Sequence, residues 1–109
     1  MLSVVLLGTY LAGGNIEKGD EIVRSQLELM KLSYFCDDPL YRSKRDAVRR
    51  SVAQLDSSTS FKVENIMELD SSLKNNPVKL NTPLNRGDCI ALIFAAQEKV
   101  DRLYEEFGR

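Results

Sequence analysis

The stretch YFCDDPLYRSKRDAVRR, residues 34–50, joins the end of one helical pattern to the start of the next. Asp38 followed by Pro39 is typical of a helix N-terminus, because aspartate caps the first turn and proline lacks only an N–H that the helix would leave unbonded. From Pro39 to Leu55 the apolar residues recur at the helical period, and those expected to be buried are Tyr41, Val48, Val52 and Leu55. The stretch therefore predicts two helices joined by a turn.

Helical periodicity continues before this turn. Two adjacent apolar stripes, Val23, Leu27, Met30, Tyr34 and Ile22, Leu29, Cys36, predict a helix that ends near Cys36. Asn15 is expected to cap it, because Ala12-Gly13-Gly14 breaks the apolar run Leu2–Leu11 that comes before. We therefore expect Leu2–Leu11 to be a separate, buried first helix.

Two more helices are expected after Leu55. Ser60 is placed to cap the first of them, which reaches Leu73, and Thr82-Pro83 repeats the cap-plus-proline signal ahead of the second. The last helix has a core stripe at spacings of three and four: Cys89, Ile93, Ala96, Val100, Leu103 and Phe107. Short strands at residues 61–64 or 78–81 are the alternatives that this part of the chain leaves open.

The predicted fold class is all-α, a compact bundle of four or five helices with short loops. At 109 residues the chain is expected to form a single helical domain, residues 1–109. Residues 1–14 also have the apolar run and small-residue exit of a secretory leader, although no Lys or Arg precedes Lys18. They are interpreted as the buried first helix, with a remnant leader as the alternative.

Composition excludes several functional classes. The chain is 43% hydrophobic and 28% charged with a net charge of −1, which argues against attraction of nucleic acid or membranes by the whole surface. It has no histidine, the commonest general base and metal ligand, and no apolar run long enough to span a bilayer. Cys36, Asp37 and Asp38 are adjacent and cannot converge on one ion. We expect no enzymatic activity, catalytic residue, cofactor or metal.

The two cysteines, Cys36 and Cys89, have two interpretations. They are buried reduced thiols that act as small core residues, or they form a disulfide that closes a long loop and stabilises the fold by about 4 kcal/mol. A reactive thiol is disfavoured, because the chain has neither a CxxC motif nor a histidine. Reduced thiols indicate the cytoplasm, whereas a disulfide indicates a periplasmic or secreted protein.

The helix after Asp38 is rich in arginine. Arg42, Arg45, Arg49 and Arg50 fall within an arc of about 140 degrees opposite Tyr41, Val48 and Val52. Such an arc is typical of an ordinary solvated helix face. Asp46 is the only acid in residues 41–50, so the excess charge also suggests a docking surface for an acidic partner.

The functional hypothesis is a non-enzymatic protein-binding module of the escort, chaperone, adaptor or toxin-neutralising type. It would bury a helical or extended segment of a partner in an interhelical groove, and the arginines would steer acidic or amphipathic partners. The alternative is a small nucleic-acid-binding regulator that uses the arginine-rich helix. A homo-oligomer is left open.

Two family resemblances agree with a binding module. The segment LLGTYLAGGNIEKGDEIVRSQLEL resembles a single tetratricopeptide unit at Tyr10, Gly14-Asn15, Ile16, Gly19 and Val23, although Leu7 and Gln26 replace small residues and no second copy follows. In that family, stacked hairpins bind peptide segments of other proteins.

The whole domain resembles the small helical pilotins of type II secretion. The shared features are a helix that ends at a cysteine, a proline-led helix, a polar break, another helix and a second cysteine at the start of the last helix. The chain departs from the family at Gly14, where a lipid-modified cysteine is expected, and in LDSSTSF, which lacks the expected tryptophan. The resemblance implies a periplasmic escort that clasps a helical segment of an outer-membrane protein.

Overall fold

In the computed structural model, the described residues form four α-helices and one turn of 3₁₀-helix. The backbone is described for residues 2–75 and 85–108, and the side chains for residues 16–75 and 85–108. The helices are α1 (Leu2–Phe35), α2 (Tyr41–Leu55), η1 (Asp56–Ser58), α3 (Val63–Asn75) and α4 (Arg86–Phe107). The predicted all-α bundle is confirmed. Residues 61–64 form a loop and the start of α3 rather than a strand, and residues 78–81 lie outside the described part.

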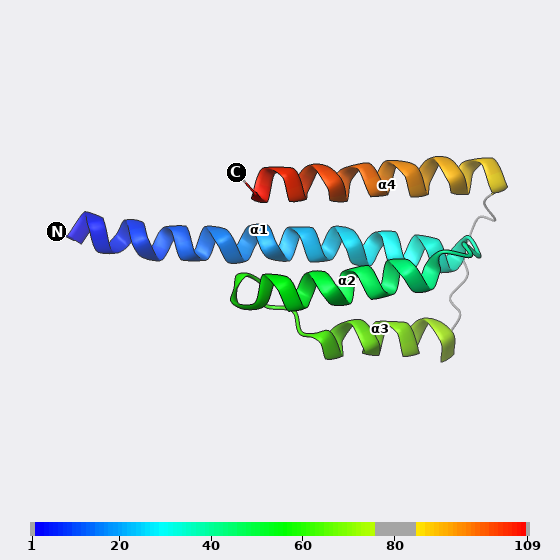
Figure 1. The fold of residues 1–109 in the computed structure, drawn as a ribbon, viewed down its shortest axis with the longest axis horizontal. Coiled ribbons are helices and arrows are strands. Elements are labelled where there is room, and N and C mark those ends of the chain that lie inside the picture. Colours follow the sequence, from blue (N-terminus) through cyan, green and yellow to red (C-terminus); the bar gives the residue numbers. More distant parts are fainter. Residues whose placement is uncertain (1, 76–84, 109) are drawn as a thin grey trace.

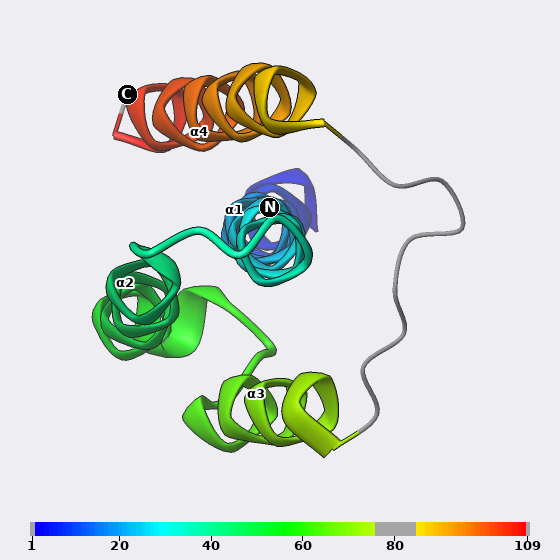
Figure 2. The same ribbon diagram turned by 90° about the vertical axis from the view of Figure 1, so that its right-hand side faces the viewer.

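α1 is the central element of the bundle. It lies between α4 on one side and α2 on the other, while α3 packs mainly on α2 (Figures 1 and 2). The molecule measures 58 × 26 × 23 Å, because the N-terminal part of α1 continues past the ends of α2 and α4 (Figure 1). α2 and α4 both run antiparallel to α1 (Figure 1), and their backbones do not pack on each other, because α1 lies between them; seen from the end, they occupy neighbouring sides of α1 (Figure 2).

The predicted break at Ala12-Gly13-Gly14 is wrong, since α1 continues through it from Leu2 to Phe35. Asn15 therefore lies within the helix rather than at its start. A glycine in a helix costs roughly 1 kcal/mol relative to alanine but does not end the helix by itself. The expected burial of residues 1–14 lies outside the described side chains.

The turn after α1 is a Schellman motif built on aspartate. The N–H of Asp38 donates to the carbonyl of Ser33 at 2.9 Å, and the N–H of Asp37 donates to that of Tyr34 at 3.2 Å. Asp37 takes the left-handed conformation, φ 53°, that glycine usually supplies at this position. Asp38 accepts the N–H of Leu40 as a cap would, but α2 begins at Tyr41, two residues later than predicted.

Asp38 also ties the two helices together. Its carboxylate accepts the hydroxyl of Ser33 at 2.9 Å and an ammonium hydrogen of Lys44, which it also pairs with as an ion. Burial alone would raise the pKa of Asp38, but the hydrogen bonds from Lys44, Leu40 and Ser33 outweigh it and lower the pKa. The Asp-Asp-Pro segment thus both ends α1 and fixes the start of α2.

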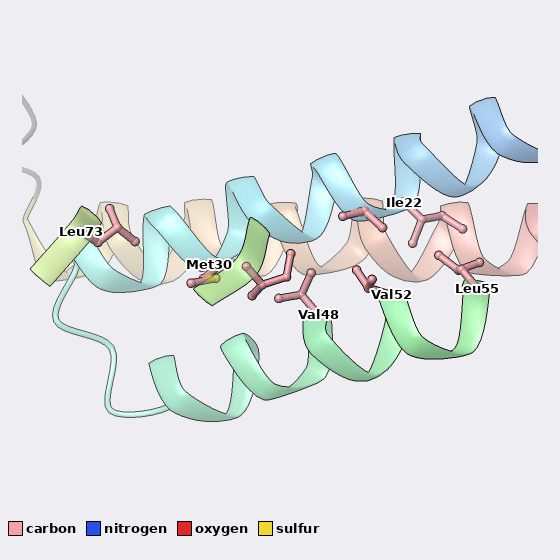
Figure 3. Close-up of a cluster of buried hydrophobic side chains, with 8 residues drawn as sticks. Ile22, Met30, Val48, Val52, Leu55 and Leu73 are labelled. Atoms are coloured by element: carbon pink, nitrogen blue, oxygen red, sulfur yellow. The ribbon is translucent and has the colours of Figure 1, made fainter. Parts of the chain in front are cut away.

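The hydrophobic core lies between α1, α2 and α3 (Figure 3). It consists of six residues of α1 and α2 that the periodicity placed inside, Ile22, Val23, Met30, Val48, Val52 and Leu55, together with Ile66 and Leu73 of α3. Leu103, Tyr104 and Phe107 of α4 pack against this cluster at its edge. The stripes at helical spacing therefore identified the buried faces.

A buried carboxylate joins α1 to the loop before α3. Asp20 accepts the hydroxyls of Thr59 and Ser60, each at 2.6 Å, and the N–H of Ser60 at 2.7 Å. Burial alone would raise the pKa of Asp20, yet these three donors lower it. Ser60 was expected to cap the next helix. It is bound to Asp20 instead, and α3 begins at Val63.

Cys36 and Cys89 form a disulfide, with Cα atoms 5.8 Å apart. The bond joins the end of α1 to the first turn of α4, which is capped by Asn85 through the N–H of Asp88 at 2.8 Å. Thr82 and Pro83, expected to open this helix, lie outside the described residues. Of the two interpretations of the cysteines, the disulfide is the one the structure supports.

Gly19 provides a test of the packing between α1 and η1. A Cβ at this position would lie 1.8 Å from the carbonyl oxygen of Ser58, which is a backbone atom and cannot turn away. We expect Gly19→Ala to lower the free energy of unfolding by at least about 2 kcal/mol, in spite of alanine's higher helix propensity. Chemical denaturation measures this directly.

Gly108→Ala is the matched control. Its added Cβ would lie no closer than 3.5 Å to another atom, so the change should stay within about 0.5 kcal/mol. Equal stabilities of the two variants would show that α1 and η1 do not approach as described.

Candidate protein-docking surface

The four arginines of α2 do not form one solvated surface. Arg42 and Arg50 are exposed and make no ion pair with any described residue. Arg45 turns towards α3: its side chain is only 17% exposed, and it pairs with Asp46 at 3.2 Å and with Asp70 at 3.6 Å. Arg49 pairs with Asp46 at 3.5 Å. The expectation that Arg45 points to solvent is therefore wrong.

Asp70, a buried residue of α3, explains the position of Arg45. Besides Arg45, it accepts the hydroxyl of Tyr41 at 2.5 Å and the ammonium of Lys74 at 3.0 Å. Burial would raise its pKa, but the donors from Tyr41 and Lys74 lower it. In return, burial and the bond to this carboxylate raise the pKa of Tyr41. These contacts hold α2 against α3, and the carboxylate of Asp70 is occupied by the donors of Tyr41, Arg45 and Lys74.

Exposed apolar side chains gather where α2 and α4 begin. Ile90 is 61% exposed and Phe94 65%, and their spacing of four places them on one side of α4, away from the buried Cys89 and Val100. Leu40, just before α2, is 57% exposed. Both Leu40 and Ile90 lie within a few residues of the disulfide, so they belong to the same end of the bundle.

Helical spacing relates these residues to the side-chain hydrogen bond that joins α2 and α4, two helices whose backbones do not pack on each other. Steps of three and four lead along α4 from Ile90 and Phe94 to Tyr104, whose hydroxyl donates to Ser51 of α2. Steps of three and four likewise lead along α2 from Leu40 to Ser51. Helical spacing thus places two rows of side chains on the sides of α2 and α4 that carry this hydrogen bond. The rows are Leu40, Lys44, Ala47 and Ser51 on and just before α2, and Ile90, Phe94, Gln97, Asp101 and Tyr104 on α4. Together with Arg50, one turn beyond Ala47, they are called the α2/α4 face below.

The sequence contained the signal for this face. Ile90 and Phe94 are large apolar residues four apart that fall off the core stripe of the last helix. The arginines of α2 give a stronger signal in the sequence, because their charge is visible there whereas the pairing of Arg45 with Asp70 is not. The acids on this helix, Glu98, Asp101, Glu105 and Glu106, are exposed.

Other candidate sites are weaker. A hollow of about 590 Å³ has all of its described lining residues on α3, among them Val63, Met67 and Glu68, so it follows the outer side of one helix. Among the described residues, no group of three acidic, cysteine or histidine side chains is placed to hold a metal ion. In that same part of the chain, no helix has the length and apolarity needed to cross a membrane.

Comparison with family models, with curated proteins and with solved structures finds no match for this chain. The α2/α4 face therefore has to be assessed on its own chemistry.

The pairing of Arg45 can be tested by charge reversal. Arg45→Glu would bring a third carboxylate beside Asp46 and Asp70 in a half-buried position, and we expect it to lower the free energy of unfolding by roughly 1–3 kcal/mol. Arg42→Glu, on the same helix but exposed, should change it by no more than about 0.5 kcal/mol. Equal and small effects in thermal or chemical unfolding would mean that Arg45 is solvated.

Proposed function

We propose that this protein is a non-enzymatic protein-binding module, of the escort, chaperone, adaptor or toxin-neutralising type. Its α2/α4 face would bury an amphipathic helix or an extended segment of a partner protein. The observation that carries the proposal is the exposure of Leu40, Ile90 and Phe94 at one end of the bundle. Ile90 and Phe94 are neighbours on one side of α4, and exposed apolar patches are characteristic of interaction sites rather than of free surface.

The energetics of such a site are favourable. Burying the exposed parts of Ile90 and Phe94 would contribute about 1–2 kcal/mol each. Aromatic residues are also frequent among the few side chains that dominate binding energy. Because the disulfide fixes the first turn of α4 against α1, little conformational entropy would be lost on binding.

Charge plays a smaller part than the sequence indicated. Two of the four arginines, Arg45 and Arg49, are engaged with Asp46 and Asp70, which leaves Arg42 and Arg50 to steer an acidic partner. The same pairing reduces the phosphate contacts available to a nucleic-acid-binding regulator. No observation of the structure favours that alternative over a protein-binding module.

The disulfide supports a location in an oxidising compartment, such as the periplasm or the extracellular space. It is also compatible with the pilotin-like arrangement of cysteines. An escort that clasps a helical segment of another exported protein is the most specific version of the proposal. The pairing of cysteines and the exposed α2/α4 face support it, while Gly14 and the missing tryptophan speak against a member of that family.

Photo-cross-linking followed by binding measurements tests the function. A photoreactive phenylalanine analogue placed at Phe94 should cross-link to one defined segment of a partner in the producing cell, whereas the same analogue at Met67 of α3 should not. Phe94→Asp should then weaken binding of the purified partner by about tenfold or more, and Met67→Asp should leave it unchanged. Met67 is a matched control, since it is an exposed apolar residue on another helix.

Salt separates the two classes of partner. Burial of an apolar segment should vary little with ionic strength, whereas phosphate contacts weaken steeply as salt rises. Cross-linking of equal strength at Phe94 and Met67, or binding to a DNA or RNA duplex that is lost on adding salt, would contradict the proposal.

A further inference from the structure

We infer that, before it meets a partner, the protein is a two-fold dimer in which the α2/α4 faces of two copies cover each other. In this dimer α2 of each copy lies along α4 of the other. The inference shares its surface with the proposed function but requires no partner protein, so each can fail without the other.

The first support is the register of α2 and α4 along α1, to which both helices run antiparallel. Counting from the disulfide, the residue that follows Cys89 is level with the residue that precedes Cys36, so Ile90 is level with Phe35. The rings of Tyr41 and Tyr34 meet edge to face, with centroids 5.3 Å apart, so Leu40 is level with Phe35 as well. The two exposed apolar residues Leu40 and Ile90 therefore lie at the same height on opposite sides of the face.

The same count places two side chains of opposite charge at nearly the same height along α1. Asp101, twelve residues after Cys89, is level with Arg24 of α1. Arg50, nine residues after Tyr41, is level with Ser25. The two heights differ by one residue, about 1.5 Å along the helix axis. Arg50 makes no ion pair with a described residue, and Asp101 accepts a hydrogen bond from Gln97 but pairs with no cation among them.

Under two-fold symmetry, residues at matching heights on α2 and α4 make the α2/α4 face complementary to itself. A two-fold axis parallel to the helices and lying in the interface exchanges the two sides of the face but keeps every height. It places Leu40 of one copy against Ile90 of the other and Arg50 against Asp101, and each contact occurs twice. Phe94, one turn beyond Ile90 on the same row, extends the apolar contact. A two-fold axis perpendicular to the helices would instead put α2 on α2 and separate the apolar ends.

The dimer also accounts for the exposure of three large apolar side chains in a single copy. Leu40, Ile90 and Phe94 are each more than half exposed and lie around a rigid disulfide-linked end. A second copy is the occupant favoured here, because both the apolar and the charged residues find their complement on the same face at the same height. A foreign helix would have to supply that pattern independently.

Sedimentation equilibrium on the purified, oxidised protein tests the inference. The wild-type chain should be in concentration-dependent equilibrium between monomer and dimer. Arg50→Asp alone and Asp101→Arg alone each place like charges together twice, and each should weaken dimerisation by at least about tenfold. Arg42→Asp is the matched control on α2, since Arg42 is exposed but lies off the face, and it should dimerise as the wild type does.

Mixing the two charge variants is the decisive experiment. In a dimer of one Arg50→Asp chain and one Asp101→Arg chain, both contacts again join opposite charges, so the mixture should recover the wild-type dissociation constant. This recovery also shows that both variants are folded. A wild-type chain that is monomeric throughout, dimerisation indifferent to Arg50→Asp, or a mixture that fails to dimerise while circular dichroism shows folded chains would each overturn the inference.

Discussion

The disulfide between Cys36 and Cys89 is the contact on which the placement of α4 depends. α4 packs mainly on α1, and the bond fixes its first turn to the last turn of that helix. A link between residues 53 apart in sequence stabilises by about 4 kcal/mol, chiefly by restricting the unfolded chain. Once this end is fixed, the apolar stripe of α4 follows α1, and Ile90 and Phe94 are left on the side that borders α2.

Buried aspartates determine how the other elements join. Asp20 binds Thr59 and Ser60, about forty residues away, and Asp70 binds Tyr41 and Arg45 on the neighbouring helix. A buried carboxylate without hydrogen-bond donors would be costly in free energy. The elements that meet at Asp20 and at Asp70 therefore have few alternative arrangements. The loop after α2 and the angle of α3 are set by these polar contacts as much as by the hydrophobic core.

The sequence identified the helices and their buried faces, because periodicity and capping are local properties. Two errors came from local signals that contacts distant in sequence override: Ser60 has a capping residue's chemistry but is taken by Asp20, and Arg45 has a surface residue's charge but is taken by Asp70. The helix break predicted at Gly13 and Gly14 was wrong for another reason, because glycine weakens a helix without ending it. The α2/α4 face could not be found from spacing alone, because it requires knowing that α2 and α4 lie on neighbouring sides of α1.

The most direct measurement is the mass of the protein, purified without reductant and alkylated in denaturant, with and without prior reduction. Because Cys36 and Cys89 are the only cysteines, an intact bond predicts no added alkyl group before reduction and two after it. A proteolytic map should then recover one peptide pair that joins the end of α1 to the start of α4. Two alkyl groups taken up without reduction would show that the thiols are separate, and would remove the constraint that positions α4 and the α2/α4 face.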